Sequence, residues 1–377
     1  MSKKEEEDEL DFDQRYVKNY IATKDIKKYH LNGEEFRGDY KISTGSKIFD
    51  KLIDGGFGSG LVRFVGPTET GKTAEALEVQ ENFLATVPNS KGILIKAEGR
   101  LDENMTARVN TKFTDDPEEW EEGMCWVFKC NVYEVVFDLL RALITDRENK
   151  TRYCILVDSM DGLIRKEDLE KSTGDAPKVA GGAVMTGDFL KRTNLYLGEF
   201  GHLCIMMAQV RAEIKTSQYD PKDRNKLGGA SGGNAAVHYP NWVIEFMRPN
   251  QGDYFRPDMK GQIGPENKPW GRNVGIRICK STNETTQLQA KYPIKFGRVG
   301  QSAIWNEREI IDLLLAWGYL IKKGSWIKTD DSVTSYLGED KPLNIQGIEK
   351  WYTVVEEDKD LCNKLSDFVD TNILDKL

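Results

Sequence analysis

Short apolar runs recur along the chain between residues 61 and 208, and turn or polar residues bound each of them. The four clearest runs are Leu61–Val65, Gly92–Ala97, Tyr153–Val157 and Leu203–Ala208. Runs of this length and composition are typical of strands that are buried on both faces of a sheet. Stretches of helical character lie between them, at 72–86, 132–146 and 186–198. This alternation predicts an α/β fold with a mostly parallel central sheet and helices on both of its faces.

The pattern changes in the second half of the chain. Three later segments have the composition of further strands, at 242–247, 274–279 and 288–296. Antiparallel pairing is an open option for them. After residue 302 a helical pattern takes over, because Glu307–Trp317 reads as an amphipathic helix and residues 357–377 as a second, acidic one. We therefore expect a small C-terminal α/β region over residues 303–377.

The first forty residues differ from the rest. Residues 1–14 are a run of charged side chains, which we interpret as a solvated tail. Residues 15–30 have the pattern of a short helix, and glycine and polar residues follow it. These breaks predict three units, which are 1–41, 42–302 and 303–377.

Composition narrows the class of protein. The chain has 377 residues, 39% of them hydrophobic, which suits a sizeable core and two or three structural units. No apolar run approaches the ~20 residues that span a bilayer, and the acidic start differs from a secretory signal, so we expect an intracellular protein without a membrane partner. The net charge of −8 argues mildly against general nucleic-acid binding, although local patches decide such binding.

The cysteine and histidine pattern offers little metal chemistry. The six cysteines include no Cys-x-x-Cys pair, and there are only three histidines. This usage argues against a zinc site. We expect the cysteines to act as small buried apolar side chains in a reducing compartment.

The strongest chemical signal is a complete G-x-x-x-x-G-K-[ST] motif, made of Gly66, Pro67, Thr68, Glu69, Thr70, Gly71, Lys72 and Thr73. It follows a predicted strand and opens a predicted helix, which is the context that the motif requires. Backbone N–H groups of such a loop surround phosphates, and the helix N-terminus favours their negative charge. We expect Lys72 to reach the β- and γ-phosphates of ATP and the Thr73 hydroxyl to bind Mg²⁺. A chance glycine turn would not fill every position.

Polar residues follow three of the predicted strands. Asp158 ends the strand Tyr153–Val157, at the edge of the sheet where α/β proteins bind ligands, and is a candidate to hold Mg²⁺. Glu98 follows the strand Gly92–Ala97, where a group that activates water and a solvated loop carboxylate are equally good interpretations. Gln209 follows the strand Leu203–Ala208, a place for a nucleotide-sensing amide.

Two long polar stretches interrupt the predicted core. The first, Arg165–Gly182, contains Lys178 and leads into Lys191 and Arg192. The second has more basic than acidic side chains and is glycine-rich, with Arg211, Lys215, Lys222, Arg224 and Lys226 before Gly228–Asn234. Long loops inside a compact domain are usually functional or disordered. The second stretch is thus a local patch suited to phosphates, although by themselves both stretches would be only flexible surface loops.

Taken in order, these motifs resemble those of the RecA-type recombinases, and most closely the phage branch to which UvsX belongs. The resemblance is carried by Ile42–Asp50, Gly66–Thr73, Ala97–Asp102, Val157–Ser159, Gln209–Arg211 and Ser231–Ala236. It covers roughly residues 42–300, with a looser similarity over 303–377. Several ordered motifs are more specific than a P-loop alone. The resemblance implies a RecA-like P-loop ATPase core over residues 42–302.

The resemblance also implies roles for single residues in catalysis. Glu98 would be the general base, acting with Lys72, and Gln209 would couple the γ-phosphate to the DNA-binding loops. Lys280 would reach the phosphates of ATP on a neighbouring subunit, so that hydrolysis requires assembled protomers. Asp102 would lie near the adenine, together with Met105, which stands where the family often places an aromatic ring.

For DNA, the resemblance implies two loops, at about 164–185 and 210–231, that line a filament axis and hold single-stranded DNA. The expected DNA-binding residues are Arg165, Lys178, Lys191, Arg192, Arg211, Lys215, Gly232, Gly233 and Asn234. The N-terminal segment 15–40 would pack on a neighbouring subunit. Thr282 departs from the family, because some members carry a second basic residue there.

The prediction is therefore an ATP- and Mg²⁺-dependent recombinase that forms helical filaments on single-stranded DNA and exchanges strands with homologous duplex DNA. Single-strand-binding and loader proteins would be its partners, in the cytoplasm of a bacterial or phage-infected cell. Two alternatives remain, which are a ring-forming hexameric helicase with the same core and a nucleotide-switched regulatory ATPase. Gln209 and the Gly232–Asn234 segment favour the recombinase. Residues 1–41 are short for the N-terminal domain of a helicase. The acidic pI of about 5.3 suits the regulatory protein.

Overall fold

The computed structural model describes residues 11–22, 31, 40–99, 102–171, 181–209, 233 and 235–376. The chain divides into two compact units, residues 1–37 and 38–377. In the first unit the described element is helix α2, Phe12–Ala22, which buries none of its residues. The helix that the sequence predicts over 15–30 thus begins three residues earlier, at Phe12, and residues 23–30 lie outside the described part of the chain.

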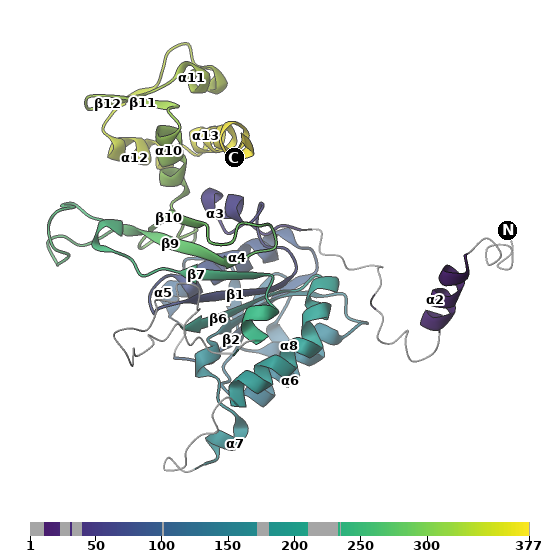
Figure 1. The fold of residues 1–377 in the computed structure, drawn as a ribbon. Coiled ribbons are helices and arrows are strands. Elements are labelled where there is room, and N and C mark those ends of the chain that lie inside the picture. Colours follow the sequence, from purple (N-terminus) through teal and green to yellow (C-terminus); the bar gives the residue numbers. More distant parts are fainter. Residues whose placement is uncertain are drawn as a thin grey trace, which may run out of the picture. The chain divides into compact units, whose positions relative to one another are not determined.

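A large sheet organises the second unit (Figure 1). Its strands are β1 Gly60–Gly66, β2 Ser90–Lys96, β3 Lys112–Thr114, β4 Met124–Phe128, β5 Arg152–Asp158, β6 Leu203–Gln209, β7 Trp242–Phe246, β8 Tyr254–Phe255, β9 Gly271–Lys280 and β10 Gln289–Lys295. They lie in the order β10-β9-β7-β1-β6-β5-β2-β4-β3, and β8 pairs with β9. The stretch from β7 to β3 is parallel throughout, whereas β8, β9 and β10 pair antiparallel.

The predicted α/β class and mostly parallel sheet are confirmed, with one correction. Antiparallel pairing holds for β9 and β10, but only in part for 242–247, because β7 lies antiparallel to β9 on one side and parallel to β1 on the other. β3 and β4 were not among the predicted strands. β3 is three residues long and only one of them is buried, so it carries no alternation to detect. β4 is an apolar run of five residues, of the same kind as the four runs that were recognised.

Helices cover both faces of the sheet (Figure 1). On one face lie α3 Lys47–Leu52 and α4 Lys72–Thr86, and on the other α6 Tyr133–Thr145 and α8 Gly181–Glu199. Shorter helices at the strand ends are α5 Glu103–Thr106, α7 Lys166–Leu169, α9 Ala235–His238, and the 3₁₀ turns η1 Pro117–Glu119, η2 Met160–Gly162 and η3 Gln251–Asp253. The helices predicted at 72–86, 132–146 and 186–198 are therefore found.

The central strand β1 supplies both cores because successive side chains of a strand point to opposite faces. Leu61 and Val65 join the core under α6 and α8, while Val62 and Phe64 join the core under α3 and α4. All four side chains are almost wholly buried. Burying such a side chain stabilises a fold by about 1.5–3 kcal/mol. This explains why the strand reads as a continuous apolar run.

A third core lies mostly in residues 303–377, around the fully buried Trp351, and also includes Phe255 of β8. The elements of this region are α10 Asn306–Ala316, β11 Leu320–Lys323, β12 Trp326–Thr329, α11 Asp331–Leu337, β13 Asn344–Gln346, α12 Ile348–Glu357, α13 Lys359–Asn372 and η4 Leu374–Lys376. The three strands form a separate antiparallel sheet, in the order β11-β12-β13. The helices predicted at Glu307–Trp317 and 357–377 correspond to α10 and α13. The domain boundaries at 41 and 302 stay predictions.

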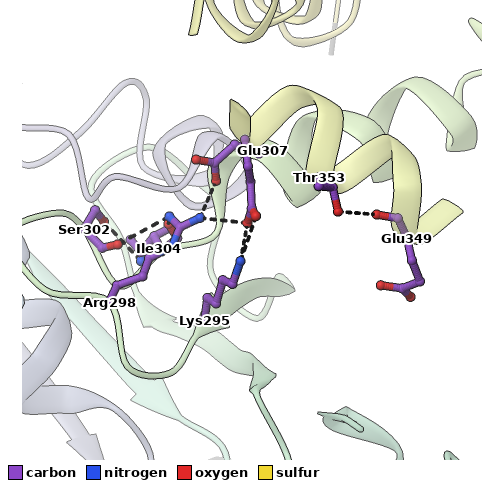
Figure 2. Close-up of polar contacts among 8 residues, drawn as sticks. Lys295, Arg298, Ser302, Ile304, Glu307, Glu349 and Thr353 are labelled. Atoms are coloured by element: carbon purple, nitrogen blue, oxygen red, sulfur yellow. Dashed lines mark hydrogen bonds and ion pairs between the residues drawn. The ribbon is translucent and has the colours of Figure 1, made fainter. Parts of the chain in front are cut away.

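Ion pairs join this C-terminal region to the segment after β10, as Figure 2 shows. The Arg298 guanidinium donates to the Ile304 carbonyl at 3.1 Å and pairs with Glu307 at 2.8 Å. Both Arg298 and Lys295 contact the Glu356 carboxylate, at 3.2 and 2.6 Å. Only 9% of the Arg298 side chain is exposed, so these pairs are better shielded from solvent than ordinary surface pairs.

A buried carboxylate of the C-terminal region also caps a helix of the core. Glu309 on α10 accepts hydrogen bonds from the Ser46 hydroxyl at 2.7 Å and from the Lys47 and Ile48 N–H groups at 3.0 and 3.2 Å. These N–H groups belong to the first turn of α3, where a helix lacks partners of its own. A carboxylate at a helix N-terminus is favourable. Glu309 therefore ties α10 to the start of α3.

Glu78 makes the stability of the fold depend on pH. Its side chain lies on α4 and the residue is only 7% exposed, and burial raises the pKa of its carboxyl from 4.5 to about 7, although a hydrogen bond with Ser302 opposes the shift. The folded protein thus holds a proton that the unfolded chain releases. The contribution of Glu78 to the free energy of unfolding is therefore fully present below pH ~4.5 and is lost as pH rises through ~7.

We expect Glu78→Gln to remove this dependence. Relative to wild type, the variant gains up to about 3 kcal/mol between pH ~4.5 and ~8, because its amide does not titrate. Urea unfolding followed by tryptophan fluorescence at several pH values measures this difference. Glu118→Gln, at an exposed position, is the control. A difference between Glu78→Gln and wild type that stays constant with pH would contradict the assignment.

Candidate functional site

The P-loop connects β1 to α4 at the carboxyl edge of the sheet. Its first residue, Gly66, has a φ of +150°, and a Cβ there would lie 2.4 Å from the Phe246 carbonyl oxygen on the neighbouring strand β7. Only glycine fits this close approach. Gly71 is the N-cap of α4, so the first N–H groups of the helix point into the loop without intrahelical partners. This arrangement suits the binding of phosphate groups.

Lys72 folds back over the loop that it follows. Its ammonium donates to the Gly66 and Pro67 carbonyl oxygens at 2.9 and 2.6 Å, and the residue is only 9% exposed. Burial lowers the pKa of Lys72, while the carboxylates of Asp158, Asp161 and Glu98 act in the opposite direction. The Lys72 ammonium thus interacts with carboxylates from the end of β5, from η2 and from the segment after β2.

The residues predicted to hold Mg²⁺ lie together. The Thr73 hydroxyl is 3.5 Å from Asp158 Oδ1, although β6 separates the strands that precede the two residues. Asp158 is 8% exposed. A hydroxyl and a carboxylate are hard oxygen donors of the kind that Mg²⁺ prefers, usually beside waters and substrate phosphates. The chemistry of this donor pair therefore fits Mg²⁺.

Glu98 and Gln209 also meet, from strands that β5 separates in the sheet. Gln209 Nε2 donates to Glu98 Oε2 at 3.2 Å. The Gln209 backbone N–H donates to Asp161 Oδ2 at 2.6 Å, which ties the end of β6 to η2. Glu98 lies directly against Gly162, since a Cβ there would be 2.3 Å from Glu98 Cγ. The candidate base and the candidate sensor are therefore one hydrogen-bonded pair.

Three polar residues of this site were not predicted from the sequence. Asp161 anchors Gln209, as above. Arg272 on β9 is 7% exposed and donates to the Glu69 carbonyl in the middle of the P-loop at 2.8 Å. Lys96 ends β2 and pairs with Asp158 at 2.5 Å. For Lys96, the only signal in the sequence was a cation at the end of a strand. Arg272 lies 203 residues after its partner Glu69, so no local pattern indicated Arg272.

The residues predicted to contact adenine lie on and before α5. Asp102 is the N-cap of α5 and accepts from the Asn104 N–H at 2.8 Å. Met105 is partly buried against the core that contains Val109. The Ala107 carbonyl accepts from Gly300 N–H at 2.7 Å, which joins the end of α5 to the segment after β10.

The described ends of the two predicted DNA loops converge. Gly233, at the end of the second loop, has a φ of +63°, and a Cβ there would lie 2.8 Å from Ala183 Cβ near the start of α8. At the other end, the Gln209–Asp161 hydrogen bond joins the start of the second loop to the turn that precedes the first. The starts of the two loops therefore lie close together, and so do their ends.

Apart from Gly233, the predicted DNA-binding residues fall into three groups. Arg165 is engaged with Asp168 at 2.5 Å, beside α7. Lys191 and Arg192 are exposed on α8, about 15 Å along the helix from Gly181 at ~1.5 Å per residue, and Arg192 pairs with Asp188 at 2.8 Å. The predicted residues that lie outside the described part of the chain are Lys178, Arg211, Lys215, Gly232 and Asn234.

Lys280 ends β9 beside the helix that follows the second loop. Its ammonium donates to the His238 carbonyl oxygen at the end of α9. A second cation holds the same helix, because the buried Arg63 of β1 donates to the Ala236 carbonyl at 3.0 Å. The exit of the second loop is thus fastened to β1 and β9.

Comparison with known proteins assigns this arrangement to a family. The family model described as Rad51 matches residues 38–242, which is more than half of the chain. The chain belongs to the Rad51 family. It is also 25% identical to the protein RecA of Nostoc punctiforme over 324 residues, covering 82% of this chain and 78% of that protein. The RecA proteins of Trichodesmium erythraeum and Leptospira biflexa are 24% and 25% identical, covering 86% and 88% of this chain and 78% and 75% of their own lengths.

Membership of the Rad51 family confirms the coarse predictions. The chain is an ATP-dependent recombinase with a RecA-like core, a DNA-dependent ATPase that uses ATP with Mg²⁺, and it binds single-stranded DNA and associates with itself. The assignment to the phage branch stays a prediction. Among the described residues, no helix has the length and apolar character needed to cross a bilayer.

Proposed function

We propose that this Rad51-family protein forms helical filaments on single-stranded DNA and exchanges strands with homologous duplex DNA. The observation that carries the proposal is the Glu98–Gln209 hydrogen bond of 3.2 Å at the common root of the two predicted DNA loops. A contact between the group that activates water and the first residue before a DNA loop lets the state of the nucleotide alter the loop. DNA binding and hydrolysis would be coupled through this pair.

In this proposal each catalytic residue has one task. Glu98 accepts a proton from the attacking water, and its contact with Gln209 orients it. Lys72 exchanges its present carbonyl partners for phosphate oxygens, assisted by the backbone N–H groups of the segment Gly66–Thr73. Thr73 and Asp158 would hold Mg²⁺, which would supply positive charge beside the phosphates. Lys280 leaves the His238 carbonyl and reaches the phosphates bound by an adjacent subunit.

Asp102 and Met105 form the adenine side of the proposed site. Met105 offers a polarizable thioether against the base in place of an aromatic ring. Its partly buried position at the margin of the core is consistent with this role. Asp102, an exposed cap of α5, has a carboxylate near the same helix.

DNA contacts in the proposal are mostly to phosphates, hence independent of sequence and sensitive to salt. The contacting residues are Arg165, Lys178, Lys191, Arg192, Arg211, Lys215, Gly232, Gly233 and Asn234. To bind DNA, Arg165 must break its ion pair with Asp168 and form one with a phosphate. Convergence of the loops at Gly233 and Ala183 supports a single binding groove formed by both.

The proposal divides the chain into a tail and oligomerisation segment at 1–41, an ATPase core at 42–302 and a C-terminal domain at 303–377. The N-terminal segment would pack on an adjacent protomer. Single-strand-binding and loader proteins would be further partners, in the cytoplasm of a bacterial or phage-infected cell. The separate core around Trp351 supports a distinct C-terminal domain.

Electron microscopy of the full chain on long single-stranded DNA, with a slowly hydrolysed ATP analogue, tests the proposal. Continuous helical filaments are the expected result. Closed rings would support a hexameric helicase with the same core, and bare DNA would support a nucleotide-switched regulatory ATPase. A strand-exchange assay with homologous and unrelated duplexes then separates a recombinase filament from a passive coating of the strand.

A further inference from the structure

An ion pair lies beside the proposed metal site and has no role in the function described so far. Lys96 is the last residue of β2 and faces Asp158, the last residue of β5, in the register of the sheet. The Lys96 ammonium is 2.5 Å from Asp158 Oδ2, and the two side chains are only 13% and 11% exposed. Ion pairs with so little exposure are weakly screened by salt. The pair is therefore a lasting feature of the nucleotide-free protein.

The two oxygens of the Asp158 carboxylate have different neighbours. Oδ1 faces the Thr73 hydroxyl at 3.5 Å, where the metal would bind. Oδ2 is occupied by Lys96. The cation therefore holds the carboxylate in one orientation and leaves a single oxygen turned towards the P-loop.

Lys96 also lowers the negative charge of the site. The carboxylates of Glu98, Asp158 and Asp161 surround Lys72, and all three interact with its ammonium. Asp161 also interacts with the buried Arg63. Three carboxylates with Lys72 and Arg63 alone would leave a net charge of −1 (3 negative, 2 positive), and Lys96 reduces it to 0 (3 negative, 3 positive). A divalent cation therefore meets a weak field until a nucleotide adds the charges of its phosphates.

We propose that Lys96 is a positioning residue that makes Mg²⁺ binding dependent on the nucleotide. It neutralises Asp158 in the empty protein, so the metal binds only together with the triphosphate. It also keeps Oδ1 directed at Thr73, so the carboxylate needs no reorientation when the metal and ATP arrive. This inference rests on the proposed roles of Thr73 and Asp158 as the metal-holding pair.

Binding of Mn²⁺ to the full-length, nucleotide-free protein tests the inference, with free Mn²⁺ measured by electron paramagnetic resonance. We expect weak binding by wild type and at least about tenfold tighter binding by Lys96→Met, because one positive charge a few ångströms from the metal is removed. Lys96→Arg keeps the charge and should bind as weakly as wild type. Equal or weaker binding by Lys96→Met would overturn the inference.

A matched control separates this local effect from the total charge. Lys129 lines the same surface cavity as Lys96, but pairs with the exposed Asp115 at 3.0 Å. Lys129→Met removes the same charge and should change Mn²⁺ affinity less than about twofold, because solvent screens an exposed pair. If both variants tighten binding equally, the effect belongs to net charge and the inference fails.

A second readout uses a fluorescent ATP analogue titrated with Mg²⁺. Lys96→Met should lower the Mg²⁺ concentration at half-maximal binding, whereas a purely structural defect would raise it. If Lys96→Met unfolds, as judged by thermal denaturation, Lys96→Gln keeps a hydrogen-bond donor without the charge and should give the same shift. No shift in Lys96→Gln would count against the inference.

Asp158→Asn distinguishes failure of this inference from failure of the proposed site. In a Lys96→Met background, Asp158→Asn should abolish the gain in Mn²⁺ affinity. If the gain persists, the metal binds elsewhere and the proposed site is wrong. If Lys96→Met gives no gain while Asp158→Asn alone weakens Mg²⁺-dependent nucleotide binding, the site stands and only the role of Lys96 is wrong.

Discussion

Lys72→Ala lowers the rate of DNA-stimulated ATP hydrolysis by at least about 100-fold, as expected for the loss of a preorganised charge that faces phosphate oxygens. The residue is 9% exposed, and its ammonium donates to the Gly66 and Pro67 carbonyls. Two other described cations lie nearby, but Lys96 is held at Oδ2 of Asp158 and Arg272 at the Glu69 carbonyl. A phosphate-release assay on long single-stranded DNA measures the effect.

The control for this variant is Lys51→Ala, on the exposed surface of α3, which should hydrolyse ATP at the wild-type rate. Thermal denaturation of both variants checks that the fold is retained. Lys72→Ala with a retained fold and normal turnover would show that another cation reaches the phosphates. Arg272, which contacts the loop at Glu69, would then be the next residue to replace.

Glu98→Gln keeps nucleotide binding but lowers turnover by about 10²- to 10⁴-fold, the range for loss of a general base. Glutamine retains the shape of the side chain, and its carbonyl oxygen still accepts a hydrogen bond from Gln209 Nε2. Because ATP is bound but not consumed, complexes with single-stranded DNA should persist after ATP addition. Single-turnover hydrolysis and the lifetime of the DNA complex measure the two effects separately.

Glu118→Gln makes the same chemical change at an exposed position of η1 and should leave both measurements unchanged. Normal hydrolysis by Glu98→Gln would mean that a different carboxylate activates the water. Asp161, which accepts from the Gln209 N–H at 2.6 Å, would be the alternative. A loss of nucleotide binding instead of turnover would place Glu98 among the binding residues.

The sequence was sufficient to predict the elements that depend on interactions between neighbouring residues. The P-loop is eight consecutive residues, and the identity of each reflects the turn and the helix that it begins. Buried strands such as β1 and β6 read as apolar runs because both faces are covered. α4, α6 and α8 were recognised for a related reason, since each follows or precedes such a strand in the alternating pattern.

Pairing between distant segments was harder to foresee. β7 lies antiparallel to β9 but parallel to β1, and its own residues did not indicate this mixed pairing. The partners of a strand depend on the whole sheet. Short elements of the C-terminal region, such as α11 and β13, also went unrecognised. Three to seven residues carry too little periodicity to be distinguished from loops.

The amino-acid sequence alone was enough to identify a nucleotide-binding α/β protein, because a P-loop and buried strands depend on contacts within a few residues. The candidates Asp158, Glu98 and Gln209 could be chosen from strand ends, but their distances to Thr73 and to one another required the fold. Lys96, Arg272 and Glu309 depend on it entirely, since their partners lie 62, 203 and 263 residues away along the chain. Such contacts form only when strand order and helix packing bring remote segments together.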